Sequence, residues 1–252
     1  MSQIHFVDGE KGGVGKSFFT RALVYHCLAR KLNFHLIDSD RSNPDVHKRY
    51  PDISQTIFFS EVEKKSNDAD RIFELSLEMP CIVNLPSQIE VIVSGWIARN
   101  GLTDELGKEY KLEIYKWFVC TGGHDSITLF IESCEKFASK IKHVLVQNYF
   151  SADEDDWEMI YREYPKLEEV IKAHNIPTLA FPRLGTTDKN LIDQNQWTFE
   201  RTVDRENTQI GALSKQRVVT FLRSLSHNLD QLGIFTPEAF KTHSAKAKKP
   251  AA

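Results

Sequence analysis

A glycine-rich segment near the N-terminus has the residue types of a phosphate-binding loop. Residues 11–17 read KGGVGKS and follow the apolar run IHFVD at residues 4–8. The glycines let successive backbone N–H groups point inward, and their missing Cβ atoms let phosphate oxygens come close. Lys16 can reach the β and γ phosphates, and the Ser17 hydroxyl can ligate Mg²⁺. The segment predicts a nucleotide site formed by Gly12, Gly13, Val14, Gly15, Lys16, Ser17 and Phe18.

This loop differs from the general P-loop pattern at one position. GxxxxGK[ST] requires glycine at residue 10, where the chain has Glu10. The alternative is a glycine-rich turn that joins a strand to a helix and binds nothing. The apolar run before the loop, the helix expected from about Lys16, and the lysine and serine in register all favour phosphate binding.

Two further segments supply polar side chains that suit a metal site. LIDSDRSNPD at residues 36–45 ends a second apolar run with Asp38 and Asp40, and side chains two residues apart on a strand point the same way. CIVNLPS at residues 81–87 ends a third run with Asn84, whose amide can hydrogen-bond a Mg²⁺-bound water but carries no charge. An Asx-rich turn is the alternative for the two aspartates.

The elements that must position these residues follow from hydrophobic periodicity. Short apolar runs alternate with stretches of 3.6-residue period, which predicts a doubly wound α/β fold with a mainly parallel sheet and helices on both faces. A last long helix is expected at about residues 211–233, with Arg217 and Arg223 off its core-facing stripe. We expect one domain over residues 1–235 and a basic, disordered tail over residues 236–252. The expected strands are 4–8, 34–38, 81–85, 114–120, 143–150 and 177–181.

The composition limits the class of protein. Hydrophobic residues make up 41% of the chain, no apolar run has the length of a membrane span, and the four cysteines form no CxxC pair. A net charge of −3 does not mark the whole chain as a nucleic-acid binder. The N-terminus has no basic and apolar regions of a signal peptide. We therefore expect a cytoplasmic protein.

The lysine before the glycine pair, Lys11, completes a resemblance to a known family. KGGVGKS resembles the deviant Walker-A motif of the ParA/MinD family, ATPases that position plasmids, chromosomes, division proteins and organelles. The resemblance implies ATP and Mg²⁺ as ligands and a homodimer that sandwiches two ATP molecules. Lys11 would contact phosphate across the interface, so dimerisation would depend on ATP. A solvated loop lysine is the alternative.

The same resemblance implies roles for the other motif residues. Asp40 would position or activate the attacking water, which gives a catalytic set of Lys11, Lys16 and Asp40. The metal set would be Ser17, Asp38 close to the ion, and Asn84 acting through a water. Asn84 stands where the family's Walker-B segment has aspartate, so we expect slow turnover.

Weaker correspondences concern the base and the dimer interface. Asn148 matches a position that reads adenine in the family, and Phe181 and Pro182 match a segment that lines the base, although these are also ordinary turn residues. VCTGGHDSITLFIES at residues 119–133 resembles a strand, loop and helix near the family's dimer interface. The glycine loop, the TGG segment and Lys-Gln-Arg near residue 215 resemble the orphan branch of TraL- and MobD-like conjugation and mobilisation proteins. The tail lacks the bulky apolar residues of a membrane-targeting helix, so no membrane binding is expected.

Together these residues favour an ATP-driven dimeric switch that positions a cargo such as a plasmid, conjugation complex or organelle, with an adaptor protein stimulating hydrolysis. Arg217, Arg223 and the lysine tail suggest nonspecific DNA binding by the ATP-bound dimer, with a solubilising surface as the alternative. Two other functions stay open. One is a metabolic P-loop amide ligase, against which Lys11 argues, and the other is an ATP-binding switch with little hydrolysis, which Asn84 favours. An iron-protein-like reductase is disfavoured because Cys120 has no evident partner.

Overall fold

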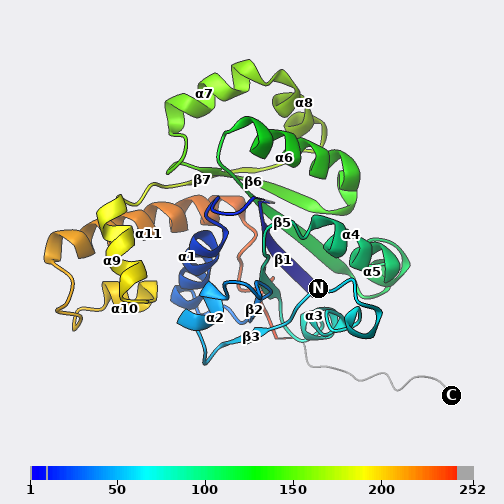
Figure 1. The fold of residues 1–252 in the computed structure, drawn as a ribbon, viewed down its shortest axis with the longest axis horizontal. Coiled ribbons are helices and arrows are strands. Elements are labelled where there is room, and N and C mark those ends of the chain that lie inside the picture. Colours follow the sequence, from blue (N-terminus) through cyan, green and yellow to red (C-terminus); the bar gives the residue numbers. More distant parts are fainter. Residues whose placement is uncertain (1, 10, 243–252) are drawn as a thin grey trace.

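The computed structural model describes residues 2–9 and 11–242, in which strands and helices alternate (Figure 1). The strands are β1 (Ser2–Asp8), β2 (His35–Asp38), β3 (Ser54–Thr56), β4 (Cys81–Asn84), β5 (Leu112–Cys120), β6 (Lys142–Asn148) and β7 (Thr178–Phe181). The helices are α1 (Lys16–Ala29), α2 (Asp45–Arg49), α3 (Asp70–Ser76), α4 (Glu90–Arg99), α5 (Glu105–Glu109), α6 (His124–Phe137), α7 (Glu154–Glu163), α8 (Pro165–Ala173), α9 (Thr186–Gln194), α10 (Phe199–Val203) and α11 (Ala212–Leu232). Short 3₁₀ helices lie at Glu63–Lys65 and Ala138–Lys140.

One parallel sheet of seven strands, in the order β3-β2-β4-β1-β5-β6-β7, organises the chain. β1 lies at its centre, with β4 on one side and β5 on the other. The chain first builds the side of β2, β3 and β4 and then the side of β5, β6 and β7. Ligands of such sheets bind outside the carboxyl ends of the strands, where the connections diverge. The glycine loop begins at this point.

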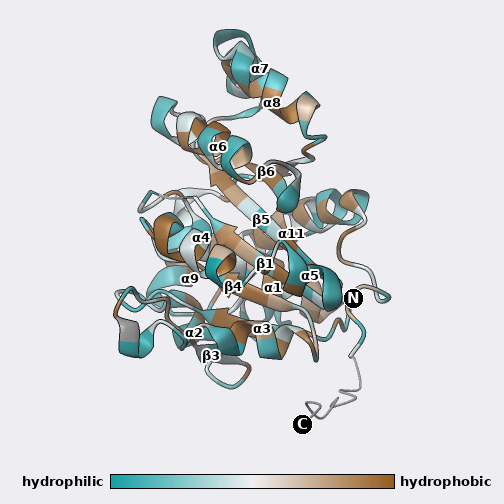
Figure 2. Ribbon diagram, turned by 90° about the vertical axis from the view of Figure 1, so that its right-hand side faces the viewer, coloured by the Kyte–Doolittle hydropathy of each residue, from teal (hydrophilic) through white to brown (hydrophobic). Residues whose placement is uncertain are grey.

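Helices cover both faces of the sheet because successive strand side chains point to opposite faces. Val7 and Trp117 belong to the core beneath α1, α2, α9, α10 and α11. Phe6 lies in the core beneath α3, α4 and α5, and Phe118 lies in the core beneath α6, α7 and α8. The strands in the middle of Figure 2 are mainly hydrophobic, while the outer helix α5 is mainly hydrophilic.

The predicted fold class is confirmed. All six expected strands are present close to their expected bounds, since strands buried on both faces are apolar runs that a sequence shows directly. The expected last helix corresponds to α11. β3 was not expected, because it is a three-residue edge strand, SQT, without apolar side chains. No helix within the described part of the chain is long and apolar enough to cross a membrane.

The packed core extends past the expected domain end at residue 235. Phe235 and Phe240 are 5% and 1% exposed, and both rings pack on His5 of β1 with centroids 5.3 and 5.5 Å from it. Phe240, which lies within the tail expected over residues 236–252, therefore belongs to the core. Phe240 is a single aromatic residue in a segment without hydrophobic periodicity, so a periodic pattern could not predict its burial. Residues 243–252, with Lys246, Lys248 and Lys249 of the expected tail, lie outside the described residues.

Candidate nucleotide-binding site

The loop after β1 adopts a shape that its glycines allow. Gly13 and Gly15 have φ angles of 79° and 102°, a region that other L-residues rarely adopt. A Cβ atom on Gly15 would also lie 3.0 Å from Nδ2 of Asn148. α1 begins directly after Gly15, so its first N–H groups and its positive dipole end lie beside the loop. The result is an anion cradle at the carboxyl end of β1.

Asp8, the last residue of β1, anchors this loop. Its Oδ1 accepts a hydrogen bond from the N–H of Gly9 at 2.6 Å, and its Oδ2 lies 2.9 Å from Nζ of Lys116 on β5. Lys116 also donates to Oγ of Ser133 at 2.9 Å, and both charged side chains are buried. Sequence reasoning missed this pair, although a lysine inside the apolar run IYKWFVC was a sign, because buried lysines need a partner.

The two lysines of the loop have different partners. Nζ of Lys16 donates to the carbonyl oxygen of Lys11 at 2.7 Å, and the Lys16 residue is 8% exposed. Lys11 is exposed, and its Nζ pairs with Asp125 at the start of α6. The hydrogen bond from Lys11 holds the pKa of Asp125 below its usual value. Lys11 thus contacts the helix that the family resemblance associates with the dimer interface.

The three predicted metal-site residues lie together. Nδ2 of Asn84 donates to Oδ1 of Asp38 at 3.0 Å and approaches Oγ of Ser17 at 3.4 Å. Oδ1 of Asn84 accepts from the Thr20 hydroxyl at 3.2 Å. As placed, the amide therefore turns its donor end toward the site. A metal-bound water donates protons and needs an acceptor, so Asn84 can hold such a water only after its amide turns over.

Asp38 is fully buried at the centre of this group. Its Oδ2 accepts the N–H of His47 at 2.9 Å, and its Oδ1 accepts the N–H of Asp40 at 3.1 Å besides the Asn84 amide. Burial raises the pKa of Asp38 above its usual value, and these hydrogen bonds lower it only in part. A cation bound beside the carboxylate would offset the cost of its burial.

Asp40 lies where the chain turns toward α2. Its Oδ1 accepts the N–H groups of Ser42 and Asn43, both at 3.0 Å. The Asx-rich turn considered as an alternative is therefore present. Asp40 also lines a cavity of about 320 Å³ together with Lys16 and Ser17. The turn thus holds Asp40 at the wall of the cavity beside the glycine loop.

A second cavity, of about 200 Å³, adjoins the loop on the side of β6 and β7. Its lining includes all three residues expected on the base side, Asn148, Phe181 and Pro182. Both ends of the Asn148 amide have a partner, because Nδ2 donates to the carbonyl of Val14 at 2.8 Å and Oδ1 accepts the N–H of Phe150 at 3.1 Å. Asn148 therefore ties β6 to the loop. Its part in reading a base stays a prediction.

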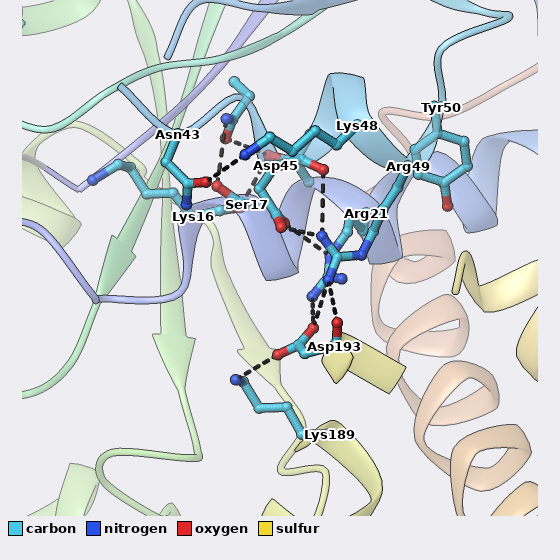
Figure 3. Close-up of polar contacts among 12 residues, drawn as sticks. Lys16, Ser17, Arg21, Asn43, Asp45, Lys48, Arg49, Tyr50, Lys189 and Asp193 are labelled. Atoms are coloured by element: carbon cyan, nitrogen blue, oxygen red, sulfur yellow. Dashed lines mark hydrogen bonds and ion pairs between the residues drawn. The ribbon is translucent and has the colours of Figure 1, made fainter. Parts of the chain in front are cut away.

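A cluster of charged side chains that sequence reasoning missed borders the first cavity (Figure 3). Arg21 of α1 lies between two carboxylates, with Nε 3.5 Å from Asp45 of α2 and one terminal nitrogen 2.9 Å from Asp193 of α9. Arg49 pairs with the same two aspartates, and Nζ of Lys189 lies 2.9 Å from Asp193. Burial raises the pKa of Asp193, but Arg21 and Lys189 outweigh it, so the pKa lies below its usual value. Only the i,i+4 spacing within α2 and α9 hinted at this cluster.

Arg217 also lies in an unexpected environment. It donates two hydrogen bonds to Asp188, at 2.6 and 2.8 Å, and Asp188 is 2% exposed. Arg217 is nevertheless exposed, as expected, with 54% of its side chain accessible, while its charge also neutralises a buried carboxylate and links α11 to α9. Arg223 is exposed, as expected.

These residues fit a nucleotide phosphate chain and Mg²⁺. The loop supplies N–H groups and Lys16 for phosphate, while Ser17 and the buried Asp38 supply the oxygen atoms that Mg²⁺ prefers. Among the residues that the structure describes, no group of three or more His, Cys, Asp and Glu side chains could hold a metal alone. Mg²⁺ would therefore depend on phosphate oxygens and waters as further ligands, as is usual for this ion.

The parallel sheet and the glycine loop directly after β1 have the arrangement of a P-loop fold. No protein family model matches the chain. In sequence it is similar to Protein MobD of Acidithiobacillus ferrooxidans, at 28% identity over 193 residues, which cover 72% of this chain and 78% of that protein.

Solved structures with a similar fold include two MinD proteins. The MinD cell division protein of Aquifex aeolicus superposes with a TM-score of 0.51 at 14% identity, covering 90% of this chain and 97% of that chain. The cell division ATPase MinD of Pyrococcus furiosus gives 0.50 at 15% identity, covering 92% and 100%. The chain thus has the MinD fold, which confirms the resemblance to the ParA/MinD family at the level of fold. The similarity to MobD agrees with the expected orphan branch.

Proposed function

We propose that the chain is an ATP-binding switch that hydrolyses ATP slowly with Mg²⁺. The observation that carries the proposal is the meeting of three segments at adjacent strand ends: the glycine loop after β1, Asp38 on β2 and Asn84 on β4. Hydrogen bonds of 3.0 and 3.4 Å connect Asn84 with Asp38 and with Ser17. The glycine loop alone offers donors for phosphate and only one hydroxyl oxygen, that of Ser17, for Mg²⁺, whereas Asp38 adds the charged oxygen atoms that this ion prefers.

Each side chain has a separate task in this proposal. Lys16 and the loop N–H groups bind the phosphate chain, and Ser17 and Asp38 hold Mg²⁺ directly or through water. When bound, Mg²⁺ neutralises phosphate charge. Asp40 orients the attacking water, because it lines the same cavity as Lys16 and Ser17.

Dimerisation on ATP binding is the second part of the proposal. Lys11 is exposed and pairs with Asp125, whose side chain is 62% exposed. A surface ion pair of this kind contributes little to stability. A phosphate group of ATP bound to a second chain is a stronger acceptor for the same lysine. The resemblance of KGGVGKS to the deviant Walker-A motif supports this exchange.

A switch with little hydrolysis is a second candidate, favoured by the orientation of Asn84. Its donor end faces Ser17 and Asp38, so it adds neither charge nor an acceptor to a metal shell. The metabolic amide ligase has no such observation in its favour, and Lys11 still argues against it.

The proposal also includes nonspecific DNA binding by the ATP-bound dimer, an adaptor that stimulates hydrolysis, and a positioned cargo. Because Arg217 is paired with Asp188, the DNA contact rests on Arg223 and the lysine tail.

In gel shifts at low salt, we expect Arg223→Ala to weaken ATP-dependent DNA binding and Arg217→Ala to lower the melting temperature instead. Absence of any shift for the wild type, with or without ATP, would exclude the DNA contact.

The central experiment combines calorimetric titration with Mg·ATP, size-exclusion chromatography with and without ATP, and phosphate release. We expect binding, an ATP-dependent dimer, and slow Mg²⁺-dependent release that Asp40→Ala abolishes. Binding and dimerisation without release would select the second candidate. A monomer that takes up no Mg·ATP would contradict both.

A further inference from the structure

Among the residues that the structure describes, the two cavities beside the glycine loop share four in their linings: Gly13, Gly15, Phe18 and Lys189. One cavity is bordered by Lys16, Ser17 and Asp40, and the other by Asn148, Phe181 and Pro182. In a nucleotide the ribose and the α-phosphate join the base to the outer phosphates. A residue that lines both cavities lies where this joining portion must pass. Lys189 is the one shared residue with a charged side chain.

Lys189 reaches this junction from α9, an element without a nucleotide-binding motif. Its side chain is 32% exposed, and its Nζ lies 5.6 Å from the centre of the Phe18 ring. Phe18 follows Ser17 directly in α1, so the residue whose ring lies near Lys189 is the sequence neighbour of a predicted phosphate-site residue. A phosphate bound in either cavity would therefore have the Lys189 cation among the residues that line it.

The contacts of Asp193 make Lys189 available to a ligand. Lys189 uses Oδ2 of Asp193, whereas Arg21 and Arg49 both use Oδ1, at 2.9 and 3.1 Å. If Lys189 turns to a phosphate, Asp193 keeps two guanidinium partners and its charge stays compensated. The exchange replaces one partly exposed ion pair with another and therefore costs little. Arg21 and Arg49 lack this freedom, because each also holds Asp45.

We propose that Lys189 is a nucleotide-binding residue that contacts the α-phosphate of the ligand. The inference rests on the proposed function. If Lys189 binds phosphate, α9 takes a direct part in nucleotide binding. The preference for a phosphorylated ligand then depends partly on a residue more than 170 positions after the loop.

The test compares affinities for adenosine, AMP, Mg·ADP and Mg·ATP by calorimetric titration of the wild type, Lys189→Ala and Lys189→Arg. The matched control is Lys172→Ala, because Lys172 forms an equivalent i,i+4 ion pair with Glu168 on the remote helix α8. We expect Lys189→Ala to weaken AMP, ADP and ATP binding alike, by about tenfold, as the loss of one charged hydrogen bond does. Adenosine binding should change less than about twofold, since it has no phosphate, and Lys189→Arg should restore most of the affinity.

Other results would overturn the inference. If the wild type binds nucleotides and Lys189→Ala binds AMP, ADP and ATP equally well, Lys189 is a surface residue and only this inference fails. An equal loss for adenosine would indicate a structural role, as would a loss of the same size in Lys172→Ala. If the wild type binds none of the four ligands, the proposed function fails as well.

Discussion

The phosphate side and the base side of the candidate site are built in different ways. On the phosphate side, the loop, Asp38 and Asn84 come from short segments at the ends of β1, β2 and β4, and hydrogen bonds join them directly. On the base side, Asn148 crosses from β6 to the loop, and Lys189 is held by an ion-pair cluster whose members Arg21 and Asp193 lie 172 residues apart. The first region is specified by residue type at fixed spacing, and the second by tertiary packing.

Loss of Lys16 is the severest test of the phosphate side. We expect Lys16→Ala to weaken Mg·ATP binding by about a hundredfold, because two charged hydrogen bonds to phosphate are lost. Calorimetric titration measures the change. Lys48→Ala is the control, since Lys48 is an exposed neighbour whose side chain makes a 3.4 Å hydrogen bond to Asn43. Unchanged affinity in Lys16→Ala would place the phosphate site elsewhere.

Removal of the Asp193 charge tests the ion-pair cluster that holds Lys189. In Asp193→Asn, Arg21 and Arg49 share Asp45 alone, and we expect the free energy of unfolding to fall by about 2 kcal/mol in urea denaturation. Asp193 has a lowered pKa in the fold, so its contribution exists above the usual pKa of aspartate and is lost as the pH falls through the lowered value. The difference from the wild type should therefore shrink below about pH 4.

A matched surface variant controls this measurement. Glu168→Gln removes one exposed ion-pair partner on α8, and the expected change in unfolding free energy is within about 0.5 kcal/mol. Equal effects of the two variants would show that the cluster is as weak as an ordinary surface pair. The contrast between the two regions would then lose its energetic basis.

The two regions also differ in how far the sequence predicts them. The sheet, the loop and the group of Ser17, Asp38 and Asn84 follow from apolar runs and from polar residues at strand ends, because parallel strands bring those ends together. The side to which the Asn84 amide turns depends on Thr20, which no motif names. The ion pairs of Asp193 depend on how α9 packs against α1 and α2. Spacing within one helix reveals at most the pair with Lys189.

Restoring a carboxylate on the phosphate side tests how far Asn84 limits the site. We expect Asn84→Asp to increase Mg²⁺-dependent phosphate release by about tenfold, because a charged acceptor replaces the amide donor. Without Mg²⁺, two carboxylates would face each other at the position of the 3.0 Å hydrogen bond, so the melting temperature should fall, and Mg·ATP should recover it. Asn195→Asp, at the exposed residue directly after α9, is the control. If release does not increase, charge at residue 84 does not limit turnover.

The smallest effect is expected at Asp125, the partner of Lys11. Asp125→Ala frees the lysine of an exposed ion pair, so the Mg·ATP concentration that gives half-maximal dimer should fall, but by less than about threefold. Sedimentation velocity at several ATP concentrations measures this shift. Glu135→Ala provides the matched control, because Glu135 forms a similar surface pair with Lys166 farther along α6 and should leave the dimer unchanged. Complete loss of the dimer in Asp125→Ala would mean that the dimer interface needs Asp125 itself. The ion pair between Lys11 and Asp125 of the same chain would then have to persist in the dimer.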